Sequence, residues 1–88
     1  MLYKSNNSLS GPQNLFITFD IGLAASLISL GYELKTVDKT NLKKSKFIFG
    51  RDEHIDKMIN EYWTDKLVLP ARSLIENIKM LKNRIYSM

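Results

Sequence analysis

The chain has 88 residues, of which 44% are hydrophobic and 25% are charged, and it carries a net charge of +4 with no cysteine. This size and balance suit one small globular domain and are too apolar for a disordered chain, and the lack of cysteine excludes disulfide frameworks, cysteine zinc sites and thiol catalysis. Small secreted domains usually carry disulfides, so we expect a cytoplasmic protein.

The first part of the chain predicts a leader followed by a strand. Residues 1–13 (MLYKSNNSLSGPQ) are rich in Asn, Ser, Gly and Pro, follow no period and lack the pattern of a secretory signal. We expect a flexible leader there and a single domain over residues 14–88. Residues 14–19 alternate and contain aromatic and β-branched side chains, which predicts the first strand.

An apolar helix follows the first strand. Thr18 and Asp20 are both good N-cap residues. Capping explains them better than an anion site, since Asp20 already places a carboxylate at the helix end. The run from residue 21 to residue 30 has no charged side chain and is too short to span a bilayer, so we expect no membrane partner. Such a helix is buried on most sides or packed on a partner.

Two further strands flank a lysine-rich loop. Residues 32–38 (YELKTVD) alternate in polarity, and residues 45–49 (SKFIF) form a second strand-like run. The connecting residues 39–44 (KTNLKK) are too many for a tight turn and include no glycine. This pattern predicts a β-hairpin with a projecting loop.

Two helices complete the predicted fold. Asp52 is expected to cap the second helix, and Pro70 suits the start of the third. The element order β-α-β-β-α-α predicts an α+β fold, a three-stranded antiparallel sheet packed by three helices, with a hairpin like that of winged-helix proteins. The predicted apolar faces are Ile55, Met58, Ile59, Tyr62 and Trp63 in the second helix, and Ala71, Leu74, Ile75, Ile78, Leu81 and Ile85 in the third.

The net positive charge lies in the predicted hairpin. Residues 33–51 hold six positive and two negative side chains, so this segment alone carries +4. Lysines that neutralise phosphates release counterions, and interleaved Thr and Asn side chains hydrogen-bond phosphates or base edges. This pattern predicts a nucleic-acid interface, with double-stranded DNA as the expected partner. Its residues are Lys35, Lys39, Thr40, Asn41, Lys43, Lys44, Lys46 and Arg51.

The hairpin also has an ordinary interpretation, because exposed lysines on edge strands discourage sheet-to-sheet aggregation. The third helix carries the basic residues Arg72, Lys79, Lys82 and Arg84, opposed only by Glu76. A solvated face with i,i+4 ion pairs is the default for this arrangement. If this face adjoins the hairpin, the two form one basic surface.

Tyr62 and Trp63 point about 100° apart on a helix, so one ring is expected in the core and the other at its margin. We expect the Tyr62 hydroxyl to lie in water. A half-exposed ring could anchor a partner protein or a second copy of the chain, which would make a homodimer.

Catalysis finds little support in the residues. His54 is the only histidine, and the chain has no phosphate-binding glycine loop and no set of residues with metal-ligand spacing. We therefore expect a protein that is not an enzyme, with no cofactor, no metal and no small-molecule substrate.

From Phe16 to the end, the chain resembles a family of small proteins of unknown function from Gram-positive phages, plasmids and other mobile elements. The matching segments are TFDIGLAASLISLGYEL (18–34), KFIF (46–49), INEYW (59–63) and LIENIKMLKNRIY (74–86). They are mainly core residues, so the resemblance implies fold and genomic setting. The family has an aspartate before the proline of its last helix, where this chain has Leu69. The arrangement is also loosely similar to small winged accessory proteins of conjugative plasmids.

Two functions follow as hypotheses. The first is a non-catalytic DNA-binding accessory protein of a mobile element, with the lysine hairpin on phosphates. The second is a protein-interaction module, an inhibitor or adaptor, that uses the apolar first helix or the Tyr62/Trp63 surface.

Overall fold

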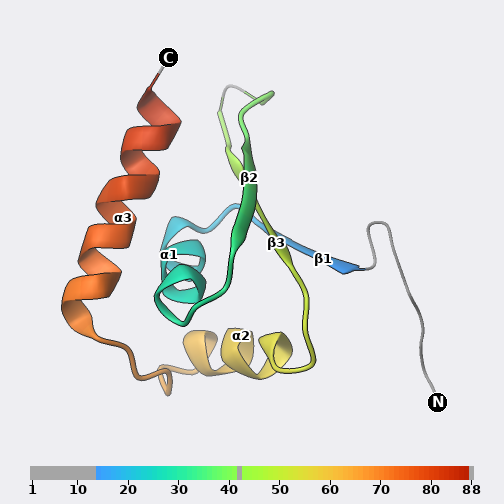
Figure 1. Ribbon diagram of the computed structural model, residues 1–88, viewed down its shortest axis with the longest axis vertical. Coiled ribbons are helices and arrows are strands. Elements are labelled where there is room, and N and C mark those ends of the chain that lie inside the picture. Colours follow the sequence, from blue (N-terminus) through green and yellow to red (C-terminus); the bar gives the residue numbers. More distant parts are fainter. Residues whose placement is uncertain (1–13, 42, 88) are drawn as a thin grey trace.

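The computed structural model describes residues 14–41 and 43–87 (Figure 1). The predicted leader lies outside the described residues. The predicted α+β fold with the order β-α-β-β-α-α is confirmed. Its elements are β1 (Leu15–Thr18), α1 (Ile21–Ser29), β2 (Leu34–Asp38), β3 (Lys46–Gly50), α2 (Ile55–Trp63) and α3 (Ala71–Tyr86).

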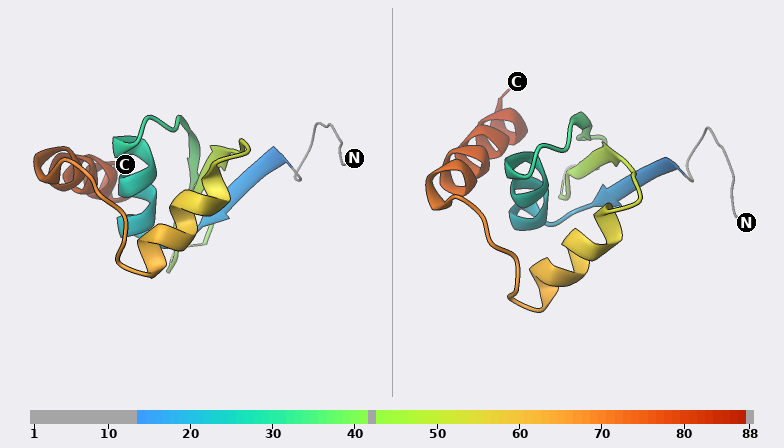
Figure 2. Two further views of the ribbon diagram at one scale, coloured as in Figure 1. Left: turned by 90° about the horizontal axis from the view of Figure 1, so that it is seen from below. Right: turned by 60° about the horizontal axis from the view of Figure 1, so that its bottom comes forward.

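The three strands form an antiparallel sheet in the order β1-β3-β2, so β3 is the central strand. Successive side chains of a strand point to opposite faces, and alternate residues of β3 are buried accordingly. Phe47 and Phe49 are the buried pair, and they belong to the same core cluster as the buried residues of α1. The sheet therefore has one face against α1 and an opposite face that no helix covers in the views of Figures 1 and 2.

Helix α1 lies between α3 and the sheet, with α2 packed across the lower end of the molecule (Figure 2). Residues 23–27 of α1 are all buried, and Leu81 of α3 and Ile55 of α2 pack in the same core. This position explains why α1 carries no charged side chain, and it confirms the prediction that the helix is buried. The buried apolar residues of α1 belong to the core of the chain itself, so they are not exposed to a partner.

Both predicted caps act at the start of α1. The Asp20 carboxylate oxygen Oδ1 accepts a hydrogen bond from the backbone N–H of Leu23 at 2.8 Å, and Thr18 Oγ1 accepts one from the N–H of Asp20 at 3.1 Å. The Tyr62 hydroxyl donates to the same Asp20 oxygen at 3.1 Å. This hydroxyl, expected to lie in water, is thus hydrogen-bonded within the chain in a partly buried position. Burial and the neighbouring carboxylate raise the pKa of Tyr62 above its ordinary value.

Two glycines permit the ends of α1. A Cβ atom on Gly22 would lie 2.5 Å from the Tyr62 hydroxyl oxygen, so only glycine leaves room for that contact. Gly31 has a φ of +101°, a conformation that residues with a side chain rarely adopt. It directly follows the C-cap residue Leu30, a position where glycine commonly ends helices.

Helix α2 begins later than the sequence indicates. Asp52 does not occupy the N-cap; that position belongs to His54, whose side chain makes no capping bond. Asp52 Oδ1 instead accepts hydrogen bonds from the N–H of His54 at 3.0 Å and from the Tyr32 hydroxyl at 2.8 Å. Asp52 thereby orders the turn before α2 and links it to the residues before β2. Partial burial and this hydrogen bond raise the pKa of Tyr32 to about 12.

Helix α3 packs on α1 with its fully buried Leu81, and Asn77 Nδ2 donates to Ser29 Oγ at 2.9 Å between the two helices. On its exposed side, Arg72 and Glu76 form the predicted i,i+4 ion pair at 3.2 Å. Within residues 14–41 and 43–87, no helix has the length and apolar character needed to cross a membrane.

Replacing Tyr62 by Phe removes the hydroxyl and keeps the ring. We expect the free energy of unfolding to fall by about 1 kcal/mol, because the Asp20 carboxylate loses a partly buried donor. Urea denaturation followed by circular dichroism measures the change. Val68→Ala is the control, since Val68 is 87% exposed, and should stay within about 0.5 kcal/mol of the parent. A Tyr62→Phe protein as stable as the parent would contradict this assignment.

Candidate nucleic-acid interface

Side chains of the hairpin turn hold its backbone in place. Asp38, at the end of β2, accepts hydrogen bonds at Oδ1 from the N–H of Thr40 at 2.9 Å and from its hydroxyl at 2.7 Å. Asn41 Oδ1 accepts one from the N–H of Lys43 at 2.9 Å. Such Asx turns replace the glycine that a tighter hairpin would need. Thr40 and Asn41, predicted to reach phosphates or base edges, thus have a structural role in shaping the turn.

The same contacts set the charge of the turn. The N–H and the hydroxyl of Thr40 both stabilise the ionised Asp38 carboxylate, and the nearby positive charge of Lys46 adds to the effect, so the pKa of Asp38 is lowered. Lys46 is the register partner of Asp38 across the hairpin. Its positive charge is therefore opposed within the hairpin itself.

Lys39 connects the hairpin to α3. Its ammonium nitrogen Nζ donates to the carbonyl oxygens of Arg84 at 2.8 Å and of Ser87 at 3.0 Å. The last carbonyls of a helix lack partners within the helix and carry partial negative charge, so a lysine is favourable there. Lys39 was predicted to contact phosphate, but in this structure its ammonium group is hydrogen-bonded to the C-terminal end of α3.

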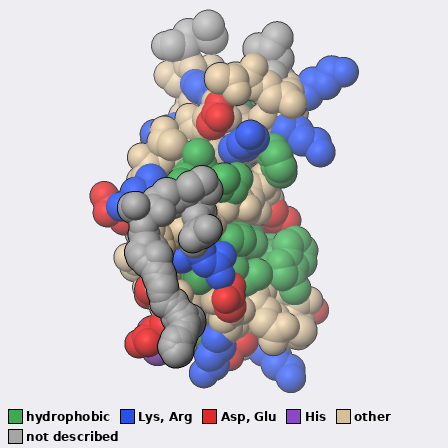
Figure 3. All heavy atoms as spheres, turned by 90° about the vertical axis from the view of Figure 1, so that its right-hand side faces the viewer, with side chains coloured by type: hydrophobic (Ala, Val, Ile, Leu, Met, Phe, Trp, Pro, Cys, Tyr) green, Lys and Arg blue, Asp and Glu red, His purple; other side chains and the backbone are tan. Residues whose placement is uncertain are grey.

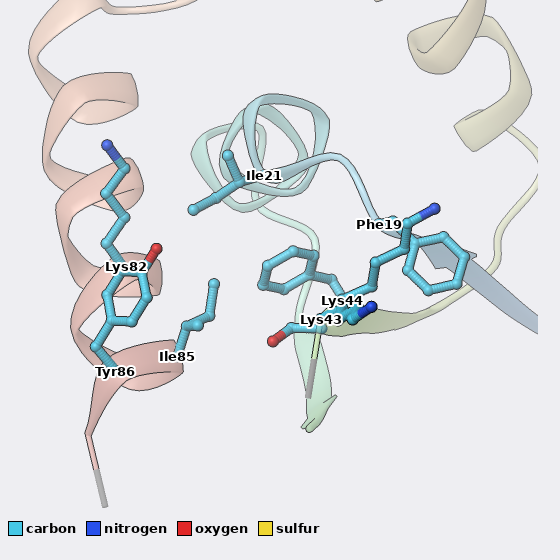
Figure 4. A pocket seen from close by; sticks show the side chains of 9 residues that line it. Phe19, Ile21, Lys43, Lys44, Lys82, Ile85 and Tyr86 are labelled. Carbon is cyan, nitrogen blue, oxygen red and sulfur yellow. The ribbon is translucent and has the colours of Figure 1, made fainter. Parts of the chain in front are cut away.

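A cavity of about 360 Å³ lies where the hairpin turn meets the C-terminal part of α3 (Figure 4). Lys43 and Lys44 come from the turn and Lys82 from α3, so the two basic regions of the sequence meet at one place. None of the residues that line the cavity is acidic. They are Phe19, Ile21, Lys43, Lys44, Ser45, Phe47, Lys82, Ile85 and Tyr86.

Two exposed aromatic rings stand on opposite walls of this cavity (Figure 4). Phe19 follows β1 and is 51% exposed, and Tyr86 ends α3 and is 78% exposed. Lys44 Nζ lies 5.3 Å from the centroid of the Phe19 ring, a cation–π distance that draws the turn toward the end of β1. Sequence reasoning did not assign Phe19 and Tyr86 to the interface, because each looks like the end of an apolar strand or helix.

The remaining predicted cations lie elsewhere. Lys35 and Arg51 line a separate hollow at the end of β3 where Gly50 lies, about 13 Å along the strand from Lys46. Arg51 forms an ion pair with Asp56. Of the residues that the sequence assigns to the nucleic-acid interface, Lys43 and Lys44 alone line the cavity, and the others lie elsewhere.

Figure 3 views the molecule from the side away from α1 and α3. Lys and Arg side chains lie at its upper end, where Figure 1 places the hairpin turn, and others lie in the middle and at the lower end of this face. Hydrophobic side chains are exposed between the upper and lower groups. Ile17 of β1 points away from the core and is 46% exposed. The candidate interface thus lies at one end of the molecule, above an exposed apolar surface.

His54, the histidine considered for catalysis, lies on the surface. Its Nε2 lies 3.5 Å from a carboxylate oxygen of Glu53, which is also exposed. In the part of the chain that the structure describes, no group of three or more His, Asp or Glu side chains could hold a metal ion.

Replacing Thr40 by Val removes one of the two donors to Asp38. We expect the pKa of Asp38 to rise part of the way to its ordinary value, because the N–H donor remains. A carboxyl group whose pKa is lowered by folding contributes stability that is lost as the pH falls through the lowered value, so Thr40→Val should reduce this acid-sensitive contribution. An NMR pH titration of the Asp38 carboxyl carbon measures the shift. Thr64→Val, which alters the exposed C-cap threonine of α2, should leave it unchanged, and an unaltered Asp38 titration in Thr40→Val would contradict the assignment.

Replacing Lys39 by Met keeps the aliphatic stem and removes the ammonium group. We expect a loss of about 0.5–1 kcal/mol in unfolding free energy and faster amide exchange in the last turn of α3, because its carbonyls lose their cation. Hydrogen exchange followed by NMR measures this fraying. Lys43→Met removes an equally exposed charge from the same loop and should leave α3 protected. Equal protection in Lys39→Met and the parent would show that Lys39 does not hold the end of α3.

Comparison with known protein families gives one match that covers nearly all of the described residues. Residues 13–87 match the family described as Domain of unknown function (DUF5659). Searches of curated proteins and of solved structures gave no significant match. The predicted resemblance to a family of small proteins of unknown function is therefore confirmed, and the chain belongs to the DUF5659 family.

Proposed function

We propose that this protein is a non-catalytic DNA-binding accessory protein of a mobile element of Gram-positive bacteria, acting in the cytoplasm. The mobile-element origin rests on the sequence resemblance from residue 16 onward, and the cytoplasmic location rests on the absence of cysteine. The contact with DNA is the cavity between the hairpin turn and α3.

One observation carries the proposal. Lys43, Lys44 and Lys82 line the same cavity, although the hairpin and α3 are far apart in the sequence. All three are exposed, and among the described residues that line the cavity with them none carries a carboxylate. A polyanion that contacts several exposed lysines releases its own condensed cations, which favours binding. The grouping therefore favours a phosphate ligand.

The interface is smaller than the sequence predicts. Arg51 is paired with Asp56, Lys39 is bound to the end of α3, and Lys46 faces Asp38. About three lysines remain for phosphate contacts, which corresponds to a slope of roughly −2.7 in a plot of log affinity against log salt concentration for duplex DNA. Affinity should therefore be modest and strongly dependent on salt.

The cavity residues suit binding better than reaction. The lining set contains lysine ammonium groups, aromatic rings and one serine, with no histidine, carboxylate or thiol. General acid–base catalysis most often uses histidine, which the lining set lacks, and the lysines and the tyrosine of the set lie exposed. The proposed role is accordingly to hold DNA, for example to mark a site for another protein.

The combined change Lys43→Glu and Lys44→Glu reverses the charge of the turn. We expect the affinity for DNA to fall on the order of 50-fold in 0.1 M salt, because two phosphate contacts and their counterion release are lost. Fluorescence polarisation with a labelled oligonucleotide measures the affinity, and circular dichroism checks the fold. Lys82→Glu should weaken binding as well, since it lies on the other side of the same cavity.

The matched control is Lys57→Glu with Lys66→Glu. These exposed lysines lie on α2 and directly after it, at the end of the molecule opposite the hairpin turn (Figure 1). The control changes net charge by the same amount, so it should keep most of the affinity. If both double variants lose binding equally, net charge alone explains the affinity, and the cavity is not the contact.

A protein-interaction role remains the second candidate because of Trp63. Its ring is 59% exposed and packs edge-on against Tyr62, with ring centroids 4.9 Å apart. An exposed tryptophan fixed by a core residue is a typical anchor for a partner or for a second copy of the chain. Under this alternative, Trp63→Ala would abolish an interaction that the lysine variants leave intact.

A further inference from the structure

We propose that the cavity between the hairpin turn and α3 takes an unpaired nucleobase, so that the DNA bound by this protein is single-stranded. This inference rests on the proposed function and deepens it, since it replaces the duplex expected from the sequence with a single strand. The expected ligand is a flat, unstacked base within a strand, with one phosphate on its 5′ side and one on its 3′ side.

The floor of the cavity is apolar. Phe47 of β3 is 1% exposed, and Ile21 and Ile85 are partly buried against the core. The volume of about 360 Å³ is at the lower end of the range for small-molecule sites. Such a space suits one base with its sugar, whereas the outer surface of a duplex presents phosphates and would leave the apolar floor uncovered.

The walls present rings to an incoming base. Figure 4 shows Tyr86 on the α3 wall and Phe19 on the opposite wall, and both rings are more than half exposed. Aromatic side chains stack on bases whatever their identity, because every base has a π face. In a duplex those faces are covered by neighbouring base pairs, so stacking requires a single strand or an extruded base.

Cations flank the rings on both walls. Lys44 is held beside the Phe19 ring, with Nζ 5.3 Å from its centroid. Lys82 precedes Tyr86 by four residues on α3, which places the two on one face of the helix, and both line the cavity. A base seated between the walls has one phosphate on its 5′ side and one on its 3′ side. The arrangement of ring and lysine on each wall matches this pattern.

The experiment compares four probes by fluorescence polarisation or competition at one salt concentration. The first is an oligothymidylate of about twelve nucleotides, and the second is a strand of the same length in which every nucleotide is abasic. The third is a hairpin duplex, and the fourth is free thymidine monophosphate, used as a competitor. The parent protein should bind the thymidylate strand on the order of tenfold more tightly than the abasic strand, because stacking of a base on an aromatic side chain contributes that much. The duplex should bind no better than the abasic strand, and the free nucleotide should compete only weakly.

Two variants assign the preference to the rings. Phe19→Leu with Tyr86→Leu should lower affinity for the thymidylate strand to that for the abasic strand, and should leave binding of the abasic strand unchanged. Tyr86→Phe keeps the ring and should bind like the parent. Trp63→Leu removes an exposed aromatic side chain outside the cavity and should also bind like the parent.

The outcomes separate this inference from the proposed function. If the parent binds the abasic strand or the duplex as tightly as the thymidylate strand, or if the ring variants retain the preference, the base-binding inference is overturned while the lysine contact stands. If thymidine monophosphate competes as well as the strand, the occupant is a free nucleotide and the single-strand assignment is overturned. If no probe binds, the proposed function itself fails.

Discussion

The contact between Lys39 and the C-terminal end of α3 connects the two elements that line the candidate interface, the hairpin turn and α3. The Lys39 ammonium group donates hydrogen bonds to the backbone carbonyl oxygens of Arg84 and Ser87, which lie 45 and 48 residues further along the chain. It satisfies acceptors that the helix leaves without partners, and it fixes the hairpin turn against α3. The contact thus joins the turn that carries Lys43 and Lys44 to the helix that carries Lys82. Lys39, which the sequence assigns to the interface, is hydrogen-bonded within the chain itself.

The scaffold beneath the cavity depends on α1. Its buried side chains pack with β3, α2 and α3 in one core, so each outer element is positioned relative to the same helix. The Asp20 carboxylate adds a polar junction, because it caps α1 and also accepts the hydroxyl of Tyr62 from α2. Charges are distributed in a complementary way. Arg51 at one end of β3 is ion-paired, while Lys43 and Lys44 at the other end stay exposed without a carboxylate on the cavity.

Much of the fold follows from local sequence. Alternation in residues 45–49 placed the strand that carries Phe47 and Phe49, and the lack of charge in α1 predicted its burial. The start of α2 was misplaced, because Asp52 has the chemistry of a cap but hydrogen-bonds to Tyr32 and to the turn before the helix. Sequence alone could not show that long-range choice.

The site was harder to predict than the fold. The excess of lysine was visible in the sequence, and it correctly indicated Lys43 and Lys44 as exposed cations. Which cations are neutralised depends on partners brought together by folding, such as Asp56 for Arg51 and the α3 carbonyls for Lys39. Phe19 and Tyr86 line one cavity because folding brings the end of β1 and the end of α3 together, which no local sequence pattern encodes.

The most direct test of the central claim, that the hairpin turn and the C-terminal end of α3 form one ligand surface, is an NMR titration of the ¹⁵N-labelled protein with a short DNA strand. The account predicts that the amide signals of Lys43, Lys44 and Ser45 shift together with those of Lys82 and Tyr86, along a single binding curve. Shifts confined to the region of Trp63 and Val68, or to only one of the two predicted segments, would contradict it.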